Sequence, residues 1–250
     1  ALTLASRLET LLPETGPAAH QMAYIYAMCG REDAAVEALN RAAAVYQDGG
    51  REDMVLATAN QGKLKELREL LAEQDCAVLS QAEFNVESVE ETGLTFIENA
   101  LLKARHAAEQ SGLPAVADDS GLVVDALEGR PGIHSARFAG EDASDADNVA
   151  LLLEKLDGVP EPHRGARFVC AMALLRFPSD PVPLICEGSW QGRIAMSPRG
   201  SGGFGYDPVF ITADGRTSAE LGAAEKNRLS HRGQAVRELV RRLPAAWPAA

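Results

Sequence analysis

Ala117-Asp118-Asp119-Ser120-Gly121 is the stretch around which the rest of this sequence is arranged. An apolar run, 113–117, ends in two adjacent acids, and a second apolar run, 122–124, follows the serine and the glycine. A buried strand that delivers carboxylates into a tight turn is a common way to build a metal or catalytic site. The same residue types are also ordinary turn formers, so the stretch by itself favours a plain turn.

The composition indicates an ordinary globular protein with an acidic surface. Hydrophobic residues make up 46% and charged residues 24% of the 250 positions, which suits one large domain or two small ones. A formal net charge of −12 makes a nucleic-acid polymer a poor partner. The four cysteines lack metal-site spacing, and no apolar run is long enough to span a membrane. We therefore expect a cytoplasmic protein with reduced thiols and no membrane segment.

Residues 1–53 are predicted to form a helical extension outside the principal domain. Two helices are expected over 20–30 and 32–47, and their small residues and tyrosines resemble a single tetratricopeptide repeat. One copy cannot bury its own apolar face. A docking hairpin, the remnant of a longer array and an extraneous extension are all compatible with this pattern. The principal domain is expected to cover 54–250.

A short apolar strand, 54–57, leads into a polar loop and a helix, an arrangement typical of phosphate binding. Backbone N–H groups at the start of a helix attract an anion, and Lys63 in the first turn adds a full positive charge. A plain turn with a surface lysine is the alternative, because the spacing is not that of a Walker A loop. The candidate contacts are Thr58, Ala59, Asn60, Gln61, Gly62 and Lys63.

Two further acids, Glu90 and Glu91, lie just before a predicted helix. Thr95 and Glu98 have the spacing of a capping box, which places the start of that helix there and its end near residue 110. The acidic pair is either solvated or available as a metal ligand. Farther along, long strands over 167–177 and 184–196 are expected to form an antiparallel hairpin.

The glycine-rich segment 199–208 is the least ordinary part of the sequence. Glycines permit close approach of the backbone to a ligand, and Phe204 and Tyr206 offer aromatic faces to a base. A flexible hairpin loop is the alternative, but aromatic residues are poor choices for one. The segment is therefore a candidate binding site for a base.

The C-terminal part is predicted to hold two helices. A second capping box, Thr217 with Glu220, marks the start of a helix that continues through Lys226. Ser230 is a natural N-cap for the last helix and places His231-Arg232 in its first turn. Cations there oppose the helix dipole, so an anionic or hydrogen-bonding ligand accounts for their placement, as does simple exposure to solvent.

Taken together, these segments resemble the inosine/xanthosine triphosphate pyrophosphatases, which remove non-canonical purine nucleoside triphosphates. The resemblance covers about 54–243 and rests on blocks at 58–63, 91–100, 117–122, 131–137, 202–207 and 230–233. It implies an α/β fold with a long, twisted mixed β-sheet flanked by helices, and two lobes with an active-site cleft between them. It also implies a homodimer that uses Mg²⁺ to cleave ITP, dITP or XTP into the monophosphate and pyrophosphate.

The resemblance further implies roles for individual residues. Glu91 and Asp119 match the metal-binding acids, and Asp119 also matches the proposed proton acceptor. The residues that match substrate contacts are Thr58, Ala59, Asn60, Gln61, Gly62, Lys63, Ser120, Phe204, Gly205, Tyr206, Asp207, Lys226, His231 and Arg232. Asp118 could share the work of Asp119, and the sequence leaves their division of roles open.

Two other functions are compatible with the same residues. An aspartyl-nucleophile phosphatase would use Asp118 or Asp119 to attack a phosphate monoester. A nucleotide-binding adaptor would only bind in the cleft and dock a partner through the N-terminal hairpin. The intact acids and the glycine loop argue against the adaptor, whereas the inorganic product distinguishes the phosphatase.

Overall fold

The computed structural model describes residues 54–58, 62–65, 68, 78–84 and 86–246. Within them one six-stranded sheet has the strand order β2-β1-β3-β4-β5-β6. Its strands are β1 (Met54–Leu56), β2 (Val78–Ser80), β3 (Ala115–Val124), β4 (Gly165–Leu175), β5 (Leu184–Ile194) and β6 (Phe210–Ile211). β1 runs parallel to β2 and β3, whereas β3 to β6 pair antiparallel. The predicted α/β fold with a long mixed sheet is confirmed.

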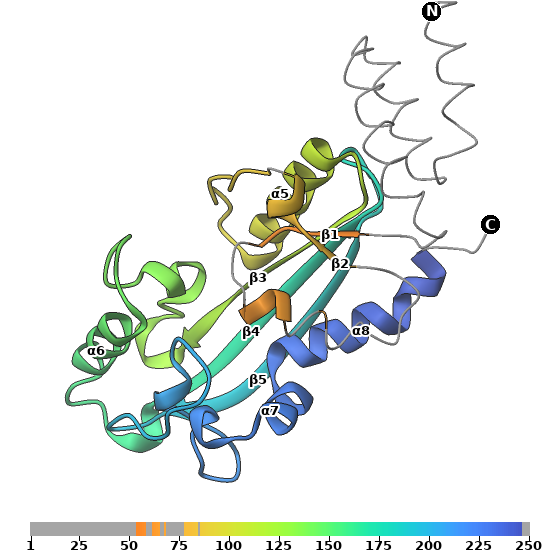
Figure 1. The fold of residues 1–250 in the computed structure, drawn as a ribbon. Helices are drawn as coiled ribbons and strands as arrows, with labels where there is room; N and C mark the ends of the chain where they lie inside the picture. The colour runs from red at the N-terminus through yellow and green to blue at the C-terminus, as the bar shows by residue number, and fades with distance from the viewer. Residues whose placement is uncertain (1–53, 59–61, 66–67, 69–77, 85, 247–250) are drawn as a thin grey trace, which may run out of the picture.

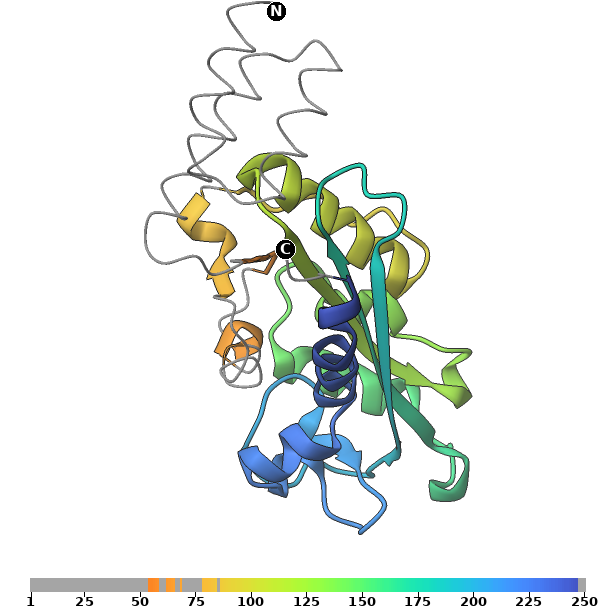
Figure 2. The same cartoon turned by 90° about the vertical axis from the view of Figure 1, so that its right-hand side faces the viewer.

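Helices cover both faces of this sheet. The α-helices of the described part are α5 (Phe96–Ser111), α6 (Asp145–Lys155), α7 (Ala223–Leu229) and α8 (His231–Ala246). Figure 1 shows α5 above and α8 below the long strands, with α6 and α7 gathered at the end away from β1 and β2. Figure 2 shows from a right angle how the long strands run from the α5 end towards the α7 end. No described helix is long and apolar enough to cross a membrane.

The sheet sends alternate side chains into two apolar layers, because successive residues of a strand point to opposite faces. Ala117 packs in the layer that contains Ala104 of α5. Its neighbour Val116 packs in the layer that contains Val236 of α8. The same alternation continues along β3, so Asp118 faces the α8 layer and Asp119 faces the α5 layer. Two adjacent acids are thereby separated onto opposite sides of one strand.

The stretch 118–121 is not a turn, and that prediction is wrong. It lies inside β3 and pairs residue by residue with 169–172 of β4. Local turn preferences are weak compared with a continuous ladder and burial on both faces. The acids therefore sit on a rigid, central strand rather than on a loop.

Most of the predicted boundaries hold. Thr95 caps α5, and the hairpin of β4 and β5 forms as expected. The capping box at Thr217 also forms, but it opens only a short 3₁₀ helix, Ser218–Glu220, and α7 begins separately at Ala223. The prediction of one continuous helix is wrong, because the backbone at Leu221 is extended.

Other predictions concern cysteines and the N-terminal extension. Cys170 and Cys186 are free and buried, as expected of reduced thiols. The helical extension predicted over 1–53 lies outside the described residues. The division into 1–53 and 54–250 stays a prediction.

Gly121 is expected to tolerate no side chain. A Cβ built there would lie 2.4 Å from the carbonyl oxygen of Gly132 and 2.5 Å from Oγ of Ser135. Gly121→Ala should therefore lower the free energy of unfolding by about 3 kcal/mol, the upper range for overpacking. Gly222→Ala is the matched control, since a Cβ there meets nothing within 4 Å. Urea denaturation of both variants tests this, and equal stabilities would contradict the packing described.

Candidate active site

Two adjoining cavities lie along β3. The larger has a volume of about 540 Å³ and the smaller about 160 Å³. Lys63, Ser120 and Ala136 line both, so the cavities meet beside the middle of β3. The predicted site residues fall on one or the other: Thr58, Glu91 and Asp119 line the larger, and 204–207, Lys226 and His231-Arg232 line the smaller.

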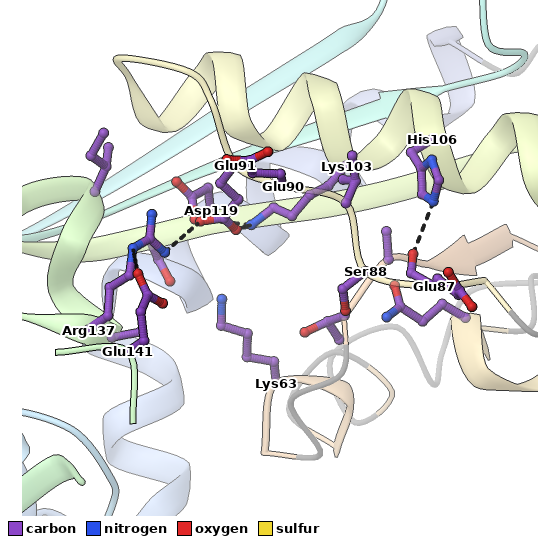
Figure 3. Close-up of a pocket in the computed structure, with 17 residues that line it drawn as sticks. Lys63, Glu87, Ser88, Glu90, Glu91, Lys103, His106, Asp119, Arg137 and Glu141 are labelled. Atoms are coloured by element: carbon purple, nitrogen blue, oxygen red, sulfur yellow. Dashed lines mark hydrogen bonds and ion pairs between the residues drawn. The ribbon is translucent and has the colours of Figure 1, made fainter. Parts of the chain in front are cut away.

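The larger cavity contains two carboxylates that share one ammonium group (Figure 3). Nζ of Lys103, on α5, donates to Oε1 of Glu91 at 2.7 Å and to Oδ1 of Asp119 at 3.0 Å. The amide of Asn99 donates to the other oxygen of Asp119 at 3.2 Å. Both donors come from α5 because Asp119 points to that face of the sheet. The two predicted metal-binding acids are thus side by side.

The environment pushes the pKa values of these two acids apart. Burial raises the pKa of Asp119, and the negative charge of Glu91 adds to this, so that the opposing effect of Lys103 is outweighed. Burial also acts on Glu91, but Lys103 and Arg137 outweigh it and hold the pKa of Glu91 below its ordinary value. Asp119 is therefore the more basic carboxylate and the better proton acceptor of the pair.

Asp118 has a different set of partners on the α8 side. Its Oδ2 lies 2.9 Å from Nζ of Lys63 and 3.6 Å from Nε of Arg232. Burial raises the pKa of Asp118, but the charges of Lys63 and Arg232 outweigh it and keep this carboxylate ionised. Asp118 is thus a neighbouring anion for the first-turn lysine and for the arginine at the start of α8. It orients both cations at the edge where the cavities meet.

The glycine–aromatic segment forms one wall of the smaller pocket. Asp207 is buried and accepts hydrogen bonds from the Phe204 backbone N–H at 2.9 Å and from Nζ of Lys226 at 2.6 Å. Nζ of Lys226 also lies 4.8 Å from the centre of the Phe204 ring, within range of a cation–π interaction. Phe204 remains 40% exposed, so its ring can still take a flat ligand.

The smaller pocket also contains a buried histidine. The ring of His231 stacks on Phe168 with centroids 4.8 Å apart. Burial, together with the nearby cations Arg232 and Lys226, lowers the pKa of His231 well below its usual value, so the ring is neutral. In the described part of the chain its Nδ1 is buried without a hydrogen-bond partner. A ligand with polar edges can satisfy it.

Other predicted residues have less direct positions. The hydroxyl of Tyr206 donates to the Ser135 carbonyl oxygen at 2.8 Å. This hydrogen bond links two residues that line the smaller pocket. Gly62 is exposed at the start of a short helical segment and lines neither cavity. Ala59, Asn60 and Gln61 lie outside the described residues.

Four residues at or beside the larger cavity had no role predicted from the sequence: Lys103, Asn99, Arg137 and Gln81. A signal existed for the first two. Asn99 and Lys103 are four residues apart, so they share one face of α5, and Asn99 is fully buried there among alanines. A buried polar residue on an otherwise apolar helix face indicates a specific partner, here Asp119.

Glu91 and Asp119 suit a divalent metal ion of the magnesium type. Such ions prefer hard oxygen ligands and are commonly held by one or two carboxylates together with substrate phosphates and water. The described residues contain no group of three or more histidine, cysteine or acidic side chains that could enclose a metal. The two carboxylates converge on a single cation, the Lys103 ammonium, which supports their suitability as a shared cation site.

Comparisons with known proteins agree with this geometry. The sequence profile of the Ham1 family matches residues 54–242. A dITP/XTP pyrophosphatase of Vibrio parahaemolyticus is 55% identical over 77% of this chain and 96% of its own length. One from Escherichia coli is 55% identical over 75% and 95%.

Solved structures give the same result. A HAM1 protein from Coxiella burnetii superposes with a TM-score of 0.74 and 50% identity, covering 77% of this chain and 98% of its own. The Staphylococcus aureus Ham1 protein has a TM-score of 0.70 at 39% identity, over 78% and 99%. Both matches cover nearly the whole of the solved chains. This chain belongs to the Ham1 family.

Proposed function

We propose that this protein is an enzyme that hydrolyses the non-canonical purine nucleoside triphosphates ITP, dITP and XTP to the monophosphate and pyrophosphate. The observation that carries the proposal is the junction of the two cavities at Lys63 and Ser120. It joins a carboxylate–ammonium cluster suited to a phosphate chain with an aromatic pocket suited to a base. Family members with this activity in their names support the same conclusion.

In the proposed mechanism the charged groups divide the work, and Asp119 has two tasks. Glu91 and Asp119 would hold Mg²⁺, which supplies charge stabilisation to the phosphate oxygens when it is bound. Lys63 and Lys103 offset the remaining negative charge of the phosphate chain. Asp119, whose pKa is raised by burial, accepts the proton of the attacking water. Asp118 stays ionised and orients Lys63 and Arg232 rather than reacting.

Base selection follows from hydrogen-bond chemistry in the smaller pocket. Hypoxanthine and xanthine have an acceptor oxygen at position 6, where adenine has a donor amino group. Arg232, 5% exposed at the pocket wall, offers donors only. A pocket that presents donors to position 6 would discriminate against adenine by about 10⁴-fold. Guanine also has the 6-oxygen, so its rejection requires a contact at its 2-amino group.

The test is hydrolysis of ITP, XTP, dITP, ATP and GTP with Mg²⁺, with the products separated by chromatography. The proposal expects the monophosphate and one pyrophosphate per turnover from the first three substrates. Orthophosphate together with a phosphorylated aspartate would instead indicate the aspartyl-nucleophile phosphatase. Tight binding of ITP without turnover would indicate the adaptor.

We further propose that the enzyme acts as a homodimer in the cytoplasm. The support is the family resemblance over about 54–243 for the dimer, and the four cysteines without metal-site spacing for the cytoplasm. Light scattering of the purified protein across a concentration series tests the dimer. A constant monomeric mass would contradict it.

A further inference from the structure

Gln81 lines the larger cavity and carries a side-chain amide that the proposed mechanism does not use. It opens the 3₁₀ helix η2 (Gln81–Phe84) directly after β2, and only 8% of it is exposed. Its backbone carbonyl accepts from the N–H of Val86, but no described residue forms a hydrogen bond with its side chain. Because Gln81 lines the 540 Å³ cavity, its amide is available to hydrogen-bond to a ligand there.

The position of Gln81 follows from the order of the strands. β1 and β2 are parallel neighbours, so their carboxyl ends meet at one edge of the sheet. Thr58 follows β1 there, Gln81 follows β2, and both line the larger cavity. Neither lines the smaller pocket. Gln81 therefore belongs to the part of the site that is remote from the base.

A triphosphate must extend towards that remote part. With the base in the smaller pocket, the chain enters at Ser120 and Ala136, where the cavities meet. Arg137 lies next to this entrance, whereas Figure 3 shows Glu87, Ser88 and His106 on the other side of the Asp119–Lys103 cluster. The cluster therefore acts near the α-phosphate, and the terminal phosphate lies on the side of Ser88, in the cavity that Gln81 also lines.

The side chains in the part of the larger cavity remote from the base suit the terminal phosphate, which must later leave as part of pyrophosphate. An amide offers two N–H donors, and Ser88 offers a hydroxyl. Nε2 of His106 donates to the Glu87 carbonyl at 3.0 Å and so fixes the segment that carries Ser88. Glu87 and Glu90 also line the cavity and are exposed. Their carboxylates repel an anion bound there and so weaken its binding. Neutral donors hold an anion less tightly than cations do, which favours release of pyrophosphate.

We propose that the Gln81 amide hydrogen-bonds to the terminal phosphate and thereby makes the enzyme prefer triphosphates to diphosphates. This inference rests on the proposed function, because it takes the base and the α-phosphate to be placed as described there. Gln81 is a specificity-determining residue in this account. IDP, which lacks the third phosphate, does not reach the amide.

The test uses Gln81→Met, which keeps the shape and removes the amide. The kcat/KM for ITP should fall about tenfold, the effect of losing one hydrogen bond to a charged group, and the value for IDP should stay within about twofold. The Kd of inorganic pyrophosphate, titrated calorimetrically with Mg²⁺, should rise by the same factor. Gln110→Met, at the exposed end of α5, is the control and should change neither value.

Other outcomes would overturn the inference. Equal losses for ITP and IDP would mean that Gln81 has only a structural role, and so would an unchanged Kd for pyrophosphate. Gln81→Glu provides a second variant of the same shape, whose negative charge should weaken pyrophosphate binding further. If the wild-type protein did not hydrolyse ITP, the proposed function would fail, and the pyrophosphate titration would still decide the role of Gln81.

Discussion

Replacing Asp119 by asparagine is expected to lower kcat for ITP by about 10³-fold, within the range for loss of a general base. The amide keeps the shape and can still meet Asn99 or Lys103, but it accepts no proton and carries no charge. Burial raises the pKa of Asp119 in the absence of a metal ion, and protonation of this carboxylate removes both a metal ligand and the base, so the wild-type rate should fall on acidification. The base works only above its pKa, so the residual rate of the variant should lack this acidic decline.

Steady-state rates with ITP and Mg²⁺ across a pH series measure this effect. Asp157→Asn, at an exposed position after α6, is the matched control and should keep the wild-type rate. Thermal melts of both variants separate a loss of activity from a loss of folding. If Asp119→Asn kept the full rate, the assignment of the central acid would be wrong.

Replacing Lys103 by methionine is expected to lower kcat/KM for ITP by about 10²-fold, because the ammonium that orients both reactive carboxylates is lost. Without the metal ion, Glu91 and Asp119 would also repel each other. The free energy of unfolding should fall by about 2 kcal/mol, less than for fully buried pairs because Lys103 and Glu91 are 17% and 22% exposed.

Magnesium provides the sharper readout for this variant. A divalent cation between the two carboxylates replaces the missing charge, so Mg²⁺ should raise the Tm of Lys103→Met more than that of the wild type. Lys155→Met, at the exposed last residue of α6, removes a lysine paired to Glu154 at 3.7 Å and is the control. An equal response to Mg²⁺ in all three proteins would contradict the shared cation site.

The parts of the fold that could be predicted are those encoded by nearby residues. Thr95 and Ser144 cap their helices through hydrogen bonds to residues three positions later, so the starts of α5 and α6 follow from local sequence. The hairpin of β4 and β5 follows in the same way from two apolar runs and a proline-containing connection. The turn assigned to 118–121 failed because its strand pairing comes from residues about fifty positions later.

The residues of the candidate site also differ in whether nearby sequence or tertiary packing reveals their role. Motif residues such as Glu91 and Asp119 could be named from the sequence and the family resemblance, and the structure brings them together. Lys103 could not, because its role appears only when α5 packs on β3. The interpretation of Lys63 also changed: Asp118, a distant residue, provides an anion that the local sequence could not show.

The central claim is that one strand, β3, joins a phosphate-binding cluster to a base pocket that selects a 6-oxo purine. The ratio of kcat/KM for ITP to that for ATP, measured with Mg²⁺ on the purified wild-type protein, tests it most directly. The account predicts a ratio of about 10⁴, with IMP and pyrophosphate as the products from ITP. Cleavage of ATP as fast as ITP would contradict it.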